Sequence, residues 1–181
     1  MGRSRFKFHE EQYPYFITQS VIGGISIFDN PLIARIVLES LKFLNTEFNV
    51  TIYAYVIMHH HIHLIVEAED IADKIRKFKS FTARRILDSL EEQNRIILLK
   101  RIKLARVTKK VESKYQLWQE GSHPVQIDTE KKMHSCIEYI HYNPVSAGFI
   151  EKPEYWCYSS ARTYVGMETN DICTFFGSET N

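Results

Sequence analysis

Four histidines occupy four of the five positions 59–63, at the start of the apolar and β-branched run HHHIHLIVE. Side chains alternate between the two faces of a β-strand, so this run predicts a strand with imidazoles on one face and apolar side chains on the other. His61 and His63 then lie side by side, a geometry suited to one divalent metal ion. His59 shares their face, so a shifted His59/His61 pair is the alternative.

The rest of the chain alternates strand patterns with helix patterns. Aromatic and β-branched residues predict strands at 13–21, 49–58, 60–67 and 117–127. The spacing of apolar residues predicts helices from Pro31 to about Asn45, from about Glu69 to Glu92, and over 129–142. This order predicts an α+β fold, a ferredoxin-like antiparallel sheet with helices on one face and an added C-terminal helix. We expect one domain over 1–165 and a polar tail at 166–181.

The last predicted helix carries two polar side chains on the flank of its apolar stripe. Tyr139 and Asn143 are one turn apart, whereas Tyr142 lies opposite the stripe and should face water. Pro144 disfavours helical geometry at Asn143, so we expect the helix to end there. The amide oxygen of Asn143 would be a hard third ligand, favouring Mg²⁺ or Mn²⁺ over zinc. The structural alternatives are core packing for Tyr139 and a helix cap for Asn143.

The net charge of +1 conceals an uneven distribution. Residues 74–114 contain 14 Lys or Arg against 4 Asp or Glu, a local charge of +10, and the rest of the chain carries −9. Such a segment favours a polyanionic partner, most simply nucleic acid, although a solvated helix face would have the same composition.

Several classes of protein are disfavoured by the sequence. The three cysteines form no Cys-x-x-Cys pair, which argues against a disulfide framework and a zinc knuckle. The absence of a Gly-x-x-x-x-Gly-Lys sequence argues against a nucleotide cofactor. No apolar run approaches the ~18 residues that cross a bilayer. We therefore expect a cytoplasmic protein without membrane contact.

Together, the His-hydrophobic-His strand, the basic middle helix and the later Tyr-x-x-x-Asn resemble the HUH single-tyrosine transposases, in particular their REP-associated tyrosine transposase branch. The matching stretches are AYVIMHHHIHLIVE, IRKFKSFTARRI, LWQEGSHPV, EYIHYNPVSAGFI and YSSARTY. The resemblance implies that Tyr139 attacks a single-stranded DNA phosphodiester, forming a 5′-phosphotyrosine link and freeing a 3′-hydroxyl. It also implies that His61, His63 and Asn143 hold the metal ion. Neutral imidazole is the ligating form, so activity should fall below about pH 6.5.

The same resemblance implies a homodimer that binds a single-stranded DNA hairpin formed by a palindromic repeat. Candidate phosphate contacts in the basic segment are Arg76, Lys77, Lys79 and Arg84. Family members usually carry Pro-Asn before the His-x-His pair, where this chain has His59 and His60. Two other functions fit the same residues: a hairpin-binding descendant that does not cut DNA, and a metal-dependent hydrolase of a small molecule.

Overall fold

A four-stranded antiparallel sheet forms the centre of the computed structural model, which describes residues 8, 13–106, 115–167 and 171–177. Its strands are β1 (Tyr15–Ser20), β2 (Thr51–Ile57), β3 (His61–Glu67) and β4 (Val125–Gln126), in the order β2-β3-β1-β4. β3 pairs with both β1 and β2 along its length, and Thr18 of β1 lies opposite His63. The strand order and the antiparallel pairing confirm the predicted α+β, ferredoxin-like class.

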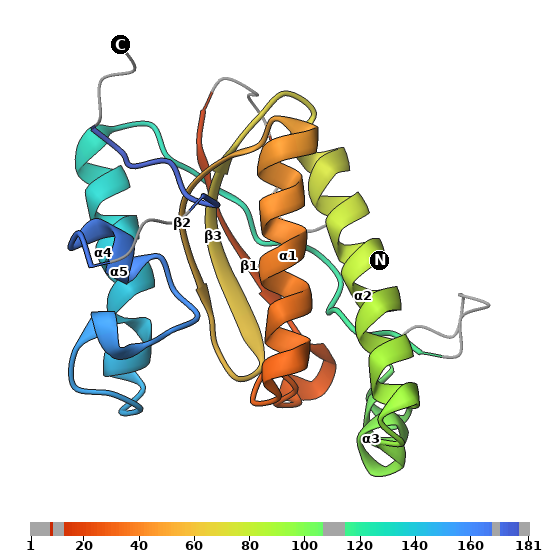
Figure 1. The fold of residues 1–181 in the computed structure, drawn as a ribbon. Helices are drawn as coiled ribbons and strands as arrows, with labels where there is room; N and C mark the ends of the chain where they lie inside the picture. Colours follow the sequence, from red (N-terminus) through yellow and green to blue (C-terminus); the bar gives the residue numbers. More distant parts are fainter. Residues whose placement is uncertain (1–7, 9–12, 107–114, 168–170, 178–181) are drawn as a thin grey trace.

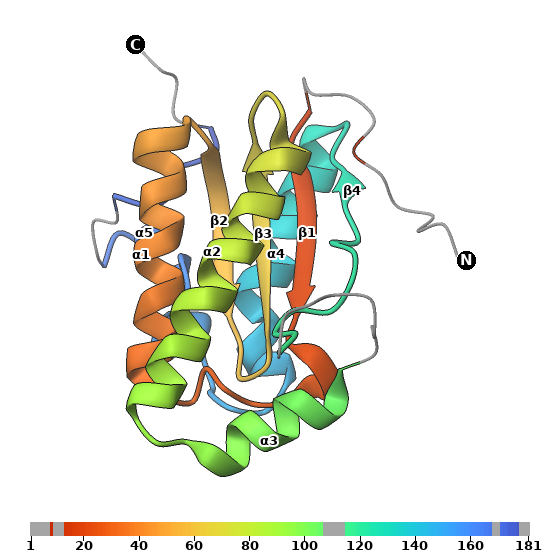
Figure 2. The same ribbon diagram turned by 90° about the vertical axis from the view of Figure 1, so that its right-hand side faces the viewer.

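The helices lie on both faces of the sheet. They are α1 (Pro31–Phe48), α2 (Ile71–Glu92), α3 (Ile96–Ala105), α4 (Glu130–Ser146) and α5 (Ala161–Tyr164), with short 3₁₀ turns η1 (Ile22–Gly24) and η2 (Pro153–Tyr155). α1 and α2 cover one face, and α4 and α5 lie on the other (Figure 1). α3 crosses the end of this arrangement, next to the C-terminal end of α2 (Figure 2). The added C-terminal helix, α4, therefore packs on the sheet face that α1 and α2 leave uncovered.

Each face of the sheet has its own apolar core. Ile62, Leu64 and Val66 of β3 pack in the larger core, together with buried side chains of α1 and α2. The second core joins Ile65 and apolar residues of β2 to the predicted stripe of α4, which consists of Met133, Cys136, Ile137 and Ile140. Because strand side chains alternate, residues 61 and 63 share the α4 face with residue 65. This alternation directs the two imidazoles toward α4.

Three segments differ from the expectations because local sequence did not determine their conformation. The segment 117–127 forms only the two-residue strand β4, and Leu117, Gln119 and Ser122 bond irregularly to the backbone around β1. The segment 95–116, which the sequence left unassigned, contains α3. Part of the polar tail is ordered: the backbone N–H of Thr174 donates to the carbonyl of Ile52 at 2.8 Å.

The prediction that the last helix ends at Asn143 was wrong, since α4 continues through Pro144 to Ser146. Proline cannot donate a backbone hydrogen bond, which costs about 3 kcal/mol inside a helix. Here the ring of Pro144 is buried, and the N–H groups of Ala147 and Phe149 still donate to the carbonyls of Asn143 and Pro144, each at 3.0 Å. Packing of the ring and closure of the last turn offset the missing bond.

Truncation of Ile140 should weaken the packing of α4 on the sheet. Its side chain is fully buried in the core between α4, β2 and β3. We expect Ile140→Ala to lower the free energy of unfolding by about 2–5 kcal/mol, since a buried aliphatic side chain is replaced by a cavity. Denaturant unfolding measures this, with Leu104→Ala (85% exposed) as a control that should change it by less than about 0.5 kcal/mol. Equal effects of the two substitutions would contradict this packing.

Candidate active site

β3 contributes two histidines to the candidate site. The ring centroids of His61 and His63 are 4.7 Å apart, with the rings nearly perpendicular. His63 is buried and His61 is half-buried. Thr18 Oγ1 and His63 Nδ1 share a hydrogen bond of 2.9 Å. In the tautomer with its proton on Nδ1, His63 donates to Thr18 and leaves Nε2 bare for a ligand.

α4 brings the tyrosine and the asparagine to the same place. The ring of Tyr139 lies edge-on to that of His63, with centroids 5.5 Å apart, and edge-on to Phe16 at 5.7 Å. Asn143, one turn later, lies close enough to His61 for its side chain to oppose, in part, the lowering of the His61 pKa by burial. About half of the Tyr139 side chain (54%) stays exposed. The structure thus brings together His61, His63, Tyr139 and Asn143, with the tyrosine open to solvent.

Burial controls the protonation of the two histidines. Desolvation, with a smaller repulsion from neighbouring histidines, lowers the pKa of His61 to about 4 and that of His63 to about 3. Both imidazoles are therefore neutral at physiological pH, which is the form that binds a metal ion. Burial thus extends the neutral, ligating form of both imidazoles to pH values below the ordinary histidine pKa of about 6.5.

The donor set fits a weakly held, oxygen-preferring divalent ion. Among the described residues, no group of three or more His, Cys, Asp or Glu side chains is arranged to hold a metal ion. His61 and His63 offer two neutral imidazoles, and Asn143 adds an amide oxygen. Three such donors would leave the other three of the six positions around Mg²⁺ or Mn²⁺ to water and phosphate oxygens.

The alternative pair, His59 and His61, is not brought together in the same way. His59 precedes β3, and its Nδ1 contacts the carboxylate of Asp29. Its ring lies against Phe149 and Trp156, with centroid distances of 4.3 and 5.5 Å. This geometry favours the His61/His63 pair.

The four basic candidates of α2 lie away from the histidines, because α2 covers the opposite face of the sheet (Figure 1). Arg76, Lys77 and Arg84 are exposed, and the first two form ion pairs with Asp73. Lys79 Nζ donates to the carbonyls of Gln119 and Gly121 at 2.9 and 2.8 Å. Burial lowers its pKa to about 8. Lys79 thus anchors the segment beside β1, whereas the other three face solvent.

Sequence reasoning missed the residues that hold the cluster in place. Phe16 stacks on His63 with centroids 5.3 Å apart, and Thr18 bonds the same ring. Both belong to β1, and only the pairing of β1 with β3 places them there. The alternation of side chains along β1 predicts that Phe16 and Thr18 share one face of the sheet. The sequence does not predict which residues of β3 lie opposite them.

A second buried histidine links α4 to the far end of the chain. His141 Nε2 and Ser160 Oγ share a hydrogen bond of 2.9 Å, and the backbone N–H of Tyr55 in β2 donates to the same hydroxyl at 3.0 Å. Desolvation lowers the pKa of His141 to about 4. The neutral imidazole is therefore part of the native packing.

Acid should weaken the fold through His141. Its folded-state pKa lies below the ordinary 6.5, so between these values the unfolded chain binds more protons and stability falls as pH falls. A shift of this size contributes up to about 3 kcal/mol. His141→Gln should flatten the pH dependence of unfolding between pH 7 and 4, measured in excess chelator. Identical pH profiles for the variant and the wild type would contradict this assignment.

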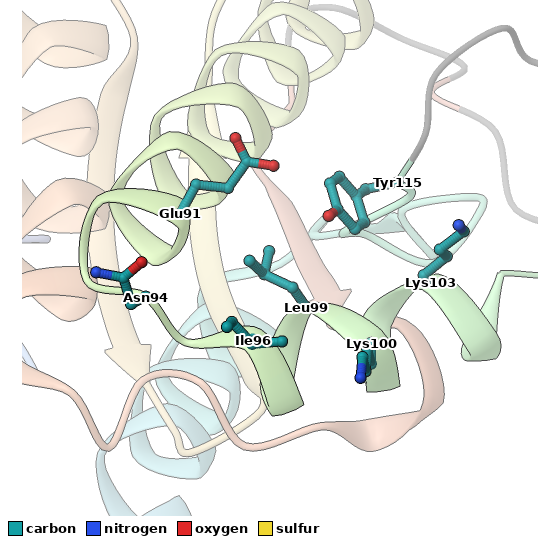
Figure 3. A pocket seen from close by; sticks show the side chains of 7 residues that line it. All are labelled: Glu91, Asn94, Ile96, Leu99, Lys100, Lys103 and Tyr115. Carbon is teal, nitrogen blue, oxygen red and sulfur yellow. The ribbon is translucent and has the colours of Figure 1, made fainter.

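A separate hollow of about 370 Å³ lies between α2 and α3 (Figure 3). Its lining includes Glu91, Leu99, Lys100, Lys103 and Tyr115, and none of the predicted site residues. The hollow is therefore distinct from the histidine–tyrosine cluster.

Within the described residues, no helix combines the length and the apolar character that crossing a bilayer requires.

Comparison with known proteins finds a matching family and a similar fold. A family model described as "Transposase IS200 like" matches residues 25–143, well over half of the chain. A search of curated proteins finds no match. Among solved structures, the fold is similar to that of a REP-associated tyrosine transposase bound to a REP hairpin. The TM-score is 0.63 at 16% sequence identity, over 97% of this chain and 96% of the other.

Proposed function

Because this chain belongs to the IS200-like transposases, the single-tyrosine family of the HUH class, we propose that it cleaves and rejoins single-stranded DNA hairpins through a 5′-phosphotyrosine intermediate. The observation that carries the proposal is the meeting of Tyr139 with the His61, His63 and Asn143 donor set on one face of the sheet. The matched range includes all four residues.

In the proposed reaction the hydroxyl oxygen of Tyr139 attacks a backbone phosphorus atom. A bond forms between that oxygen and phosphorus, and the bond from phosphorus to the 3′-oxygen breaks. The phenol loses its proton and the 3′-oxygen gains one. Since the phosphodiester is exchanged for another phosphodiester, attack by a 3′-hydroxyl can reverse the step without a nucleotide cofactor.

His61, His63 and Asn143 would hold the divalent ion, Mg²⁺ or Mn²⁺. When bound, such an ion supplies electrostatic stabilisation of the charge that develops on the phosphate oxygens. Thr18 keeps the ring of His63 oriented, and Phe16 packs against both that ring and the ring of Tyr139. These contacts preorganise the nucleophile and the ligands before DNA arrives.

The hairpin substrate is proposed from the similar solved structure, which is described as bound to a REP hairpin. Exposed cations of α2 supply phosphate contacts in this proposal, with Arg76, Lys77 and Arg84 foremost and Lys79 bound to backbone carbonyls. We further propose that the protein acts as a homodimer, as the family resemblance implies, and in the cytoplasm, as the lack of a Cys-x-x-Cys pair among its three cysteines favours.

A covalent adduct distinguishes this function from its two alternatives. Hairpin DNA labelled downstream of the cleavage site is incubated with the protein and Mn²⁺, then separated under denaturing conditions. We expect label joined to protein through the 5′ end of the downstream fragment. Hairpin binding without any adduct would favour a non-cleaving binding protein, and cleavage without an adduct would favour a metal-dependent hydrolase.

A further inference from the structure

A groove lined by aromatic rings runs between α1 and α2, on the sheet face opposite the active site. Phe43 and Phe48 of α1 and Phe78 and Phe81 of α2 line it, together with Lys77. We call this the phenylalanine groove. Phe43 and Phe81 are each 52% exposed, which is unusual for two large apolar side chains so close together. The rings of Phe43 and Phe48 have centroids 5.5 Å apart.

Cations lie at the rim of the phenylalanine groove. Lys77 Nζ is 5.9 Å from the ring centroid of Phe48, and the guanidinium of Arg85 is 5.9 Å from that of Phe81. Residues 71–86 of α2 contain six Lys or Arg and one acidic residue, Asp73, which pairs with Lys77 at 2.9 Å. Of these cations, Lys77 and Arg85 lie at the rim of the groove, whereas Lys79 bonds to carbonyls beside β1.

A surface of aromatic rings with cations beside them is suited to bind unpaired nucleotides. Bases stack on aromatic side chains whatever their sequence, while Lys and Arg bind the phosphates. The groove has a volume of about 240 Å³, below the roughly 300 Å³ of ordinary small-molecule pockets, so a single flat ring suits it better than a larger ligand. A second copy docked by this same surface would bring like charges together, which opposes a symmetric contact.

We propose that the phenylalanine groove binds unpaired nucleotides of a DNA strand, with a base stacked on Phe43 or Phe81 and flanking phosphates on Lys77 and Arg85. The proposal rests on the proposed function for the identity of the polyanion. It adds a surface for base stacking to the phosphate contacts already proposed for α2, on the face of the sheet opposite the catalytic cluster. The protein would then hold one part of a strand on α1 and α2 while another part reaches Tyr139.

The test uses oligodeoxythymidylate, which forms no hairpin, in excess chelator so that the metal site does not contribute. The double variant Phe43→Leu/Phe81→Leu keeps apolar volume and removes the stacking faces. We expect its affinity, measured by fluorescence anisotropy, to fall roughly 10-fold or more. Phe175→Leu, at an exposed phenylalanine (45%) near the C-terminus, is the matched control and should bind as the wild type does. Arg85→Gln should lower the slope of log affinity against log salt by about 0.7.

Crosslinking of the wild type provides a second measurement that does not depend on how the variants fold. Oligodeoxythymidylate containing 5-iododeoxyuridine should attach on irradiation to peptides that contain Phe43 or Phe81. Crosslinks confined to other peptides, or an affinity unchanged in the double variant, would overturn the groove proposal. A double variant that changes only the sedimentation of the protein would instead assign the groove to protein contact.

The outcomes separate this proposal from the proposed function. If the wild type forms the Tyr139 adduct although the Phe43→Leu/Phe81→Leu substitutions leave the affinity for oligodeoxythymidylate unchanged, the transposase function is supported and the groove proposal is contradicted. If the double variant binds oligodeoxythymidylate more weakly but the wild type forms no covalent adduct, the groove proposal is supported and the cleavage function is contradicted.

Discussion

Replacement of Tyr139 by phenylalanine should abolish the covalent protein–DNA adduct and slow strand cleavage by about 10³-fold or more, as loss of a nucleophile does in other covalent catalysts. The substitution removes only the hydroxyl group. The ring contacts of Tyr139 with His63 and Phe16 involve its edges and faces, so the phenylalanine can retain them. The fold and the hairpin affinity should therefore stay close to those of the wild type.

Tyr142 is the matched control for this experiment, because it lies on the same helix and is 50% exposed, against 54% for Tyr139. Tyr142→Phe should form the adduct at nearly the normal rate. End-labelled hairpin DNA and denaturing electrophoresis report both reactions. An adduct that persists in Tyr139→Phe and disappears in Tyr142→Phe would move the nucleophile to the other tyrosine.

Removal of both imidazoles of β3 should have a similarly large effect. We expect His61→Ala/His63→Ala to reduce metal-dependent cleavage at least about 10²-fold, since even outer partners of metal ligands typically change metal affinity or activity 10–100-fold. Binding of Mn²⁺, followed by its electron paramagnetic resonance signal, should weaken in parallel. This second readout separates lost metal binding from lost DNA binding.

Single substitutions of the neighbouring histidines discriminate between the two possible ligand pairs. His60 is exposed, and His60→Ala should keep both Mn²⁺ binding and cleavage. His59→Ala should keep the metal as well, because His59 contacts Asp29, Phe149 and Trp156. Loss of Mn²⁺ binding in His59→Ala but not in His63→Ala would establish the shifted pair. Full cleavage by the His61→Ala/His63→Ala protein in excess chelator would falsify metal dependence.

Local periodicity predicts how the four candidate residues group in two pairs, whereas their assignment to one site came from the family resemblance. Alternation along β3 puts His61 and His63 on one face, and the helical repeat puts Tyr139 and Asn143 on one flank of α4. The apolar stripe of α4 then selects which flank meets the sheet. These features depend only on neighbours in the sequence, which is why the sequence predicts them.

Features that depend on contacts between distant segments were not predictable in this way. Thr18 reaches His63 only through the register of β1 against β3. The charge of α2 is visible in the sequence, but its position opposite the active site follows from the packing of α1 and α2 on one core. Pro144 continues a helix because its ring is buried by the rest of the fold, which outweighs the local preference.

The flanking segments of the sheet restrict how two copies of this protein can associate. Beside β1, the N–H of Gln119 donates to Ser20 at 2.8 Å, and beside β2 the N–H of Ile57 donates to Tyr158 at 2.8 Å. Backbone groups that pair within the chain are not free to add a strand from a partner. A homodimer built by joining two sheets into one continuous sheet is therefore blocked along these stretches. Along these stretches, two copies would have to meet through side chains rather than strand pairing, and the short strand β4 is the end of the sheet that these hydrogen bonds do not cover.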